Sequence, residues 1–130
     1  MKVIRFPIFA FVFAVAALVT AYAGQKTAPC ATLTLQASPA TVPAGGVETL
    51  SGSITSCSQA VQRFTISYVI EGPCNYSDSY TVAVNLKPGE TQVASVSRTA
   101  PLCPGTYTIT GTVTVGGTYV TSTFTSYTVQ

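Results

Sequence analysis

Four cysteines, at positions 30, 57, 74 and 103, carry the most distinctive chemistry in this sequence of 130 residues. They are separated by 27, 17 and 29 residues, whereas zinc sites use ligand pairs about two to four residues apart. The sequence also contains no histidine, the other common zinc ligand. An even number of widely spaced cysteines instead indicates disulfides formed in an oxidising compartment. We therefore expect two disulfides, and we expect neither a metal site nor a cofactor.

The lack of histidine also bears on catalysis, because it removes the usual general base of Ser-His-Asp and Cys-His mechanisms. Two carboxylates can hydrolyse a glycoside or share a calcium ion, and Glu71 and Asp78 are the pair that flanks a single segment. Like Glu48 and Glu90, however, both lie near expected turns or strand ends, where a carboxylate is ordinarily solvated. The sequence therefore predicts that the protein is not an enzyme.

Two tyrosines lie in a segment that one disulfide would hold in place. Tyr76 and Tyr80 belong to residues 74–80, which we expect to form a loop between strands. Exposed tyrosines suit stacking against a sugar or contact with a protein. Asn75, Tyr76, Asp78 and Tyr80 therefore form a candidate binding loop, and ordinary packing of the loop is the simpler alternative.

The first 23 residues have the pattern of a signal peptide. Lys2 and Arg5 provide a basic start, an apolar run follows, and residues 21–23 form an A-x-A cleavage motif. A transmembrane helix is the alternative, but the apolar span is shorter than about 20 uninterrupted residues and contains a proline. We expect a secreted or periplasmic product without stable membrane insertion, with residues 24–29 as a short linker and residues 30–130 as one domain.

Removal of residues 1–23 would balance the charge. The whole sequence has six lysine and arginine residues and four acidic residues. Lys2 and Arg5 would leave with the signal peptide, so four basic residues would face four acidic ones, for a formal net charge of zero. A neutral domain lacks the basic surface that nucleic acid or an anionic membrane attracts. Neither is expected as a partner.

Apolar and polar residues alternate along most of the chain after the signal peptide, which is the period of half-buried strands, and no helical period persists. Tyr107 stands four residues after Cys103, and we expect its hydroxyl to cap the corner at the start of a strand. The pattern predicts an all-β fold, a seven-stranded antiparallel immunoglobulin-like β-sandwich, with a small barrel as the alternative. The expected strands are residues 31–37, 47–55, 61–70, 79–86, 91–98, 100–115 and 118–129.

Four cysteines allow three pairings, and the path of the chain through a sandwich distinguishes them. If each strand crosses the domain once, Cys30 and Cys57 lie at one end of it, and Cys74 and Cys103 lie at the other. A disulfide spans only about 6 Å between Cα atoms, so no bond can run from end to end. We therefore predict the pairs Cys30 with Cys57 and Cys74 with Cys103.

Threonine recurs at alternate positions of the last two expected strands, so a hydroxyl-rich outward face is a second candidate binding surface. Threonine is also simply a good residue for an exposed strand, which is the simpler interpretation. The residues expected on this face are Thr108, Thr110, Thr112, Thr114, Thr121, Thr123 and Thr125, with Tyr119 and Tyr127 at its ends.

Three turn and corner motifs stand before expected strands, and they are Leu86-Lys87-Pro88-Gly89-Glu90, Thr99-Ala100-Pro101 and Pro104-Gly105-Thr106-Tyr107. With the strands after them, these motifs resemble those of bacterial extracellular immunoglobulin-like modules of the CARDB type, a cell-adhesion-related family. The resemblance covers nearly the whole chain after the signal peptide, and it implies the sandwich fold more strongly than any function. The family is associated with large surface proteins that repeat such modules, whereas one module here implies a small accessory protein.

We therefore expect a non-catalytic secreted domain that binds a protein or glycan at the cell surface or in the envelope. The contact would use the 74–80 loop or the threonine face. One alternative is a small inhibitor of an extracellular hydrolase, because sandwich loops can enter an active-site cleft. Another is a structural subunit that assembles through sheet edges.

Overall fold

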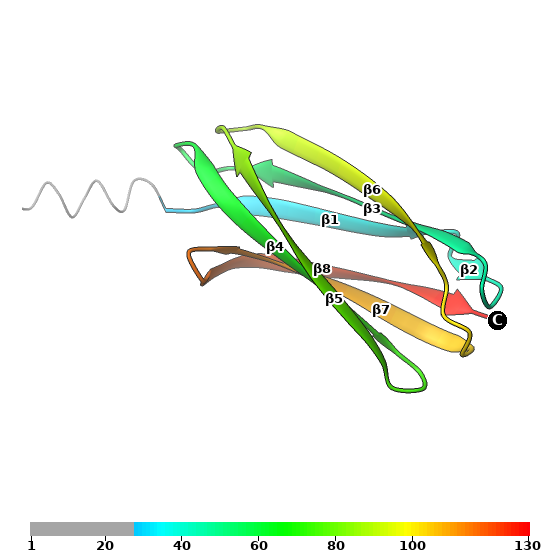
Figure 1. Ribbon diagram of the computed structural model, residues 1–130. Coiled ribbons are helices and arrows are strands. Elements are labelled where there is room, and N and C mark those ends of the chain that lie inside the picture. Colours follow the sequence, from blue (N-terminus) through cyan, green and yellow to red (C-terminus); the bar gives the residue numbers. More distant parts are fainter. Residues whose placement is uncertain (1–27) are drawn as a thin grey trace, which may run out of the picture.

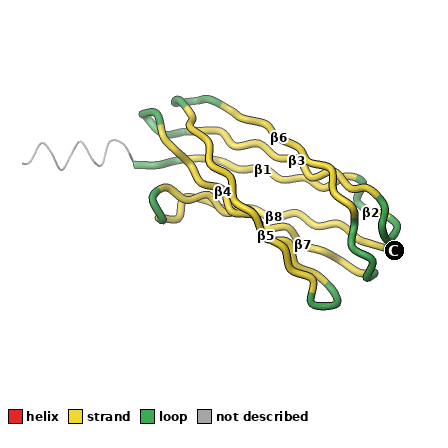
Figure 2. The backbone as a smooth tube through the Cα atoms, viewed as in Figure 1, coloured by secondary structure: helices red, strands yellow, loops and turns green. Residues whose placement is uncertain are grey.

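A computed structural model of the chain describes residues 28–130 (Figure 1). The predicted signal peptide and most of the predicted linker lie outside the described residues. Figure 2 shows that the described part consists of strands joined by loops and turns. The strands are β1 (Ala31–Ser38), β2 (Thr41–Val42), β3 (Val47–Ser56), β4 (Gln62–Gly72), β5 (Tyr76–Leu86), β6 (Thr91–Thr99), β7 (Gly105–Val115) and β8 (Thr118–Val129).

The strands form two sheets, as the alternating pattern predicts. One sheet has the order β1-β3-β6 and the other the order β2-β8-β7-β4-β5. Each of the seven long strands corresponds to an expected one, and all pairs between them are antiparallel. β6, whose alternation in the sequence is weak, lies at an edge of its sheet. The fold is therefore an immunoglobulin-like β-sandwich.

The short strand β2 is an addition to the expected seven, and it pairs with β8 in parallel. The segment lies between the expected strands 31–37 and 47–55, and Pro39 and Pro43 flank it. Val42 is 2% exposed and belongs to the core, so burial of its side chain holds the segment against the five-stranded sheet. Thr128 N–H donates to the Ala40 carbonyl and Gln130 N–H to the Val42 carbonyl, which completes the pairing.

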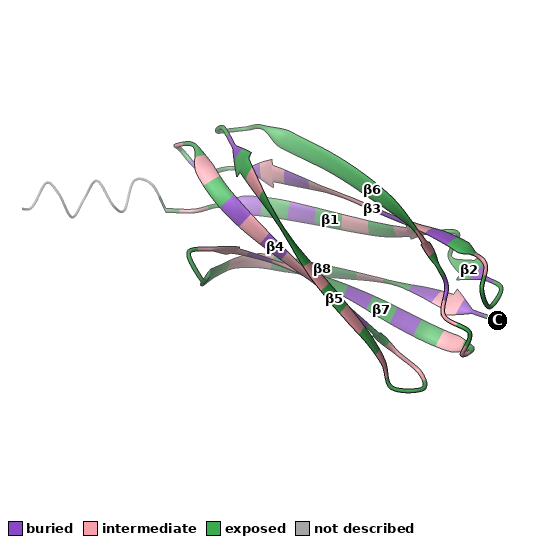
Figure 3. Ribbon diagram, viewed as in Figure 1, coloured by how far each residue is buried: buried purple, intermediate pink, exposed green. Residues whose placement is uncertain are grey.

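Apolar side chains from both sheets meet in two core clusters. One surrounds Tyr107 and Ile109, and the other surrounds Phe64 and Val113. Figure 3 shows the resulting alternation of buried and exposed residues along β7. The Tyr107 hydroxyl donates a hydrogen bond of 2.6 Å to the Cys103 carbonyl, which confirms its expected role at the corner before β7.

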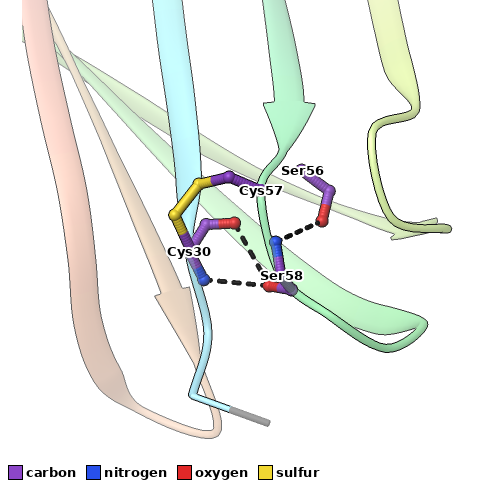
Figure 4. The surroundings of a disulfide bond; sticks show 4 residues. All are labelled: Cys30, Ser56, Cys57 and Ser58. Carbon is purple, nitrogen blue, oxygen red and sulfur yellow. Dashed lines mark hydrogen bonds between the residues drawn. A yellow bond between two sulfur atoms is a disulfide. The ribbon is translucent and has the colours of Figure 1, made fainter. Parts of the chain in front are cut away.

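The disulfides join Cys30 to Cys57 and Cys74 to Cys103, the pairs that the strand order predicts, across Cα separations of 4.9 and 6.4 Å. Serines surround the first bridge (Figure 4). The Ser58 hydroxyl accepts a hydrogen bond from Cys30 N–H and donates one to the Cys30 carbonyl, and Ser58 N–H donates to the Ser56 hydroxyl. This network fixes the start of β1 to the end of β3.

The two long sides of the sandwich differ. On one side β1 packs against β8. On the other side β5 and β6 are joined by the turn at residues 87–90 and then separate along their length (Figure 1). The two sheets are thus in contact along one long side of the sandwich and separated along the other.

Candidate binding surfaces

The predicted binding loop is largely strand. β5 begins at Tyr76, whereas the sequence analysis placed its start at residue 79, so only a short turn around Cys74 and Asn75 remains. Both turn residues have positive φ, at 60° and 58°. The strand starts earlier because residues 76–79 continue the antiparallel pairing with β4, from Tyr76 opposite Gly72 onward.

Three of the four predicted loop residues turn toward the interior. Tyr76 packs edge-on against Tyr107 with ring centroids 5.5 Å apart, and Tyr80 stacks on Tyr68 at 4.9 Å. Asp78 shares their face of the strand, whereas Asn75 is exposed in the turn. The expectation of exposed tyrosines on a loop is therefore wrong, because their rings fill space at the side of the core.

Arg98 of β6 links these residues to the other sheet. Its Nη2 donates to Asp78 Oδ2 at 2.8 Å and to the Tyr76 hydroxyl at 3.1 Å. The hydrogen bond from Arg98 lowers the pKa of Asp78 below its usual value. Arg98 was not among the predicted site residues, although it is the only charged residue among the nine of β6 and shares the inward register with Val96.

Glu48 of β3 is buried rather than solvated, which corrects the expectation for this carboxylate. It is 1% exposed, and neither carboxylate oxygen has a hydrogen-bond partner. Burial raises its pKa to about 7, although the nearby Arg98 charge opposes the shift. Glu48 lies inside because it precedes Leu50 by two residues and so shares that residue's inward register. Glu71, by contrast, is exposed.

The threonine face is only partly as predicted. Thr108 and Thr110 of β7 are exposed on the outward face, and Thr112 is half-buried beside them. On β8, however, Thr121, Thr123 and Thr125 lie opposite Val113, Gly111 and Ile109, so they share the inward register. Tyr127 is likewise buried at 5% exposure. The predicted ladder of threonines across both strands is therefore wrong for β8.

The residues of β8 that do face outward are Ser122, Phe124 and Ser126, opposite Thr112, Thr110 and Thr108. A register shift between Val113 and Thr114 also brings Tyr119 to this face, where its hydroxyl lies 3.2 Å from that of Ser122. Phe124 is 70% exposed and Tyr119 is 63% exposed. We call this surface the hydroxyl face. It is defined by Ser67, Val69, Glu71, Thr108, Thr110, Thr112, Tyr119, Ser122, Phe124 and Ser126.

A second surface feature, which the sequence analysis missed, lies between the two sheets where β5 and β6 separate. Two adjoining cavities of about 210 and 190 Å³ are both lined by Gly52, Tyr68, Val82 and Ala94. Val82 and Val96 beside them are 43% and 44% exposed. We call this apolar gap the lateral slot. No sequence pattern predicts the lateral slot, because the slot depends on how far apart the two sheets lie.

Among residues 28–130, no three side chains of His, Cys, Asp or Glu gather where they could hold a metal ion. The described residues also contain no helix long and apolar enough to cross a membrane. Glu71 and Asp78, the pair of carboxylates considered from the sequence, have different surroundings. Glu71 is exposed, whereas Asp78 is bound to Arg98.

Comparisons with known proteins find relatives in structure only. No family model matches the chain, and no curated protein matches it. The CARDB domain of the PF1109 protein from Pyrococcus furiosus, solved in complex with di-metal ions, matches with a TM-score of 0.62 at 19% identity. The match covers 78% of this chain and 93% of that domain.

Parts of larger enzymes match as well. A β-glucosidase from Erythrobacter marinus has a TM-score of 0.63 at 16% identity, with 78% of this chain covered. The alkylpurine DNA glycosylase AlkC from Pseudomonas fluorescens has a TM-score of 0.59 at 19% identity, with 77% covered. The chain spans only 16% and 30% of those two proteins, and identities this low indicate a shared fold alone. The protein therefore has the fold of the CARDB domain, a CARDB-like immunoglobulin-like β-sandwich.

Proposed function

We propose that this protein is an exported, non-catalytic binding domain that contacts a glycan or protein of the cell surface or envelope through the hydroxyl face. The observation that carries the proposal is the exposure of Phe124. Its side chain is 70% exposed and lies directly opposite Thr110 on the outward side of the five-stranded sheet. A large apolar ring gains nothing for the fold in that position, because exposed apolar area stays in contact with water.

The surroundings of Phe124 support recognition of a neutral ligand. Thr110, directly opposite on β7, and Val69, opposite Thr110 on β4, are uncharged, and serines stand two residues away on either side along β8. Glu71, opposite Thr108, places a carboxylate farther along the same face. An aromatic ring stacks on the apolar face of a sugar or fills a pocket of a protein, while hydroxyls supply donors and acceptors around it. Export is supported by the two disulfides, which form and persist in oxidising compartments.

The test is to measure binding of the disulfide-bonded protein to an array of cell-surface glycans and, separately, to a detergent extract of envelope proteins. Phe124→Ala should weaken the interaction at least tenfold, since centrally placed aromatic residues dominate such contacts. Leu102→Ala is the matched control, because Leu102 is equally exposed at 78% but lies in the loop before β7. Equal losses for both variants, or none for Phe124→Ala, would exclude the hydroxyl face.

A further inference from the structure

β6 has one edge without a partner strand in the described part of the chain. It is the last strand of the order β1-β3-β6, and its nine residues pair with β3 without any register shift. A regular edge of this length presents a row of backbone N–H and C=O groups to any strand that approaches.

The usual protections of an edge strand are missing from residues 91–97 of β6, and the strand has one inward-pointing charge near its end, Arg98. Residues 91–97 include no charged residue and no proline, and the strand contains no bulge. Natural edge strands are normally blunted by such features. Arg98 is the single charge, and it is already paired with Asp78. The edge is therefore both regular and nearly neutral.

β6 is also the most exposed of the long strands, and its exposure extends to the side that faces the other sheet. Eight of its nine residues are exposed, as Figure 3 shows along its length, and Val93 reaches 72%. Ala94 and Val96 point toward the lateral slot, where Val82 of β5 is also exposed. An incoming strand would therefore cover apolar side chains as well as backbone groups. β5, the edge strand of the five-stranded sheet on the same side of the sandwich, has a better buried inward row that ends in Leu86.

The distribution of charge beside β6 indicates which kind of strand would pair with it. Since Asp78 balances Arg98, this side of the molecule has no acidic or basic strip that would select a charged peptide. A second β6 is as neutral as the first. In an antiparallel pair centred on Ser95, Ala94 lies opposite the partner's Val96, and Arg98 lies opposite the partner's Gln92, so that no like charges meet.

We propose that two copies of this chain associate through β6, antiparallel about a twofold axis at Ser95. The three-stranded sheets then join into one six-stranded sheet, and each β6 covers the lateral slot of the other copy. The interface is isologous, so the same residues contribute from both copies. It uses the side of the molecule between β5 and β6 rather than the hydroxyl face, so it is independent of the function proposed above.

The test uses the disulfide-bonded protein in size-exclusion chromatography with light scattering and in sedimentation velocity, over a range of concentrations. Ser95→Lys and Ser95→Glu each set two like charges opposite one another at the twofold axis. Each variant alone should weaken dimerisation at least tenfold, and an equimolar mixture of the two should restore it as a heterodimer. Restoration in the mixture also shows that both variants are folded.

The matched control is Ser79→Lys, because Ser79 is an exposed serine on β5, the edge strand of the other sheet on the same side of the molecule. This variant should dimerise as the unaltered protein does. A protein that stays monomeric at all concentrations would overturn the proposal. A dimer that dissociates in the Ser79→Lys variant but persists in the Ser95→Lys variant would also overturn it. Binding of an added apolar peptide in the lateral slot of a protein that remains monomeric would overturn it as well.

Discussion

Glu48 and Arg98 are cross-strand partners in the β3–β6 register, yet the Arg98 guanidinium donates to Asp78 and Tyr76 and leaves the Glu48 carboxylate without a hydrogen bond. The arginine thus ties the two sheets together at the end of the lateral slot, and a buried acid is left beside it. Burial without a hydrogen-bond partner destabilises the charged form of a carboxylate.

Glu48→Gln should therefore stabilise the protein at alkaline pH. The pKa of Glu48 is about 7 in the folded protein against a usual 4.5, so the folded state holds the proton more tightly than the unfolded state does. Stability accordingly falls as the pH rises from about 4.5 to 7, by at most about 3 kcal/mol, and stays low above it. Glu48→Gln should remove this fall, as urea unfolding at pH 5 and pH 8 would show.

The control for that experiment is Glu71→Gln, because Glu71 is exposed on the outward side of β4. It should leave the difference between pH 5 and pH 8 unchanged. A Glu48→Gln protein that loses as much stability between these pH values as the unaltered protein would show that Glu48 is not the titrating group.

The second disulfide should contribute much of the stability of the domain. Cys74 and Cys103 are 29 residues apart, and closing a loop of that length stabilises a fold by roughly 3 to 4 kcal/mol on the chain-entropy model. Replacing both cysteines by serine should lower the free energy of urea unfolding by that amount. Replacing Cys30 and Cys57, which are 27 residues apart, should cost a similar amount. A loss below about 1 kcal/mol for either pair would contradict the chain-entropy model here.

Two neighbouring residues of β8 should differ in how strongly an introduced charge destabilises the protein. Thr123 lies opposite Gly111 on the inward side, whereas Ser122 is exposed on the hydroxyl face. Thr123→Asp should therefore destabilise the protein by about 1 to 3 kcal/mol, since it forces a charge against the core. Ser122→Asp should change stability by no more than about 0.5 kcal/mol. Thermal unfolding distinguishes the two, and the reverse order would restore the threonine ladder that the sequence suggested.

The sequence was sufficient for the existence and order of the seven long strands, the disulfide pairs and the corner at Tyr107, because each depends on local alternation or on which end of the domain a residue reaches. The alternating pattern predicted the wrong inward face for β8, because threonines occupy both faces of this strand and only Tyr127 and Val129 are buried on the inward side. The register shift at Val113 and Thr114, which turns Tyr119 outward, has no signature in composition.

Other features were beyond the sequence because they depend on distances between sheets. Glu48 looked solvated beside a turn, but the inward register of β3 buries it. The lateral slot arises where β5 and β6 separate, which no pattern within one strand encodes. The role of Arg98 follows from the same separation, because only a long side chain spans the gap to Asp78.

The packing of Gly72 beneath Tyr107 gives a prediction about the corner itself. A Cβ at position 72 would overlap ring atoms of Tyr107, which is fully buried and held by its hydrogen bond to Cys103. Gly72→Ala should therefore cost about 1 to 3 kcal/mol, as overpacking of a core does. The cost should persist in a Tyr107→Phe background, because the clash is with the ring and not with the hydroxyl. Chemical denaturation of the two single variants and the double variant measures both quantities. A Gly72→Ala protein as stable as the unaltered one would mean that the ring can move aside, and that the hydroxyl does not fix it at the corner.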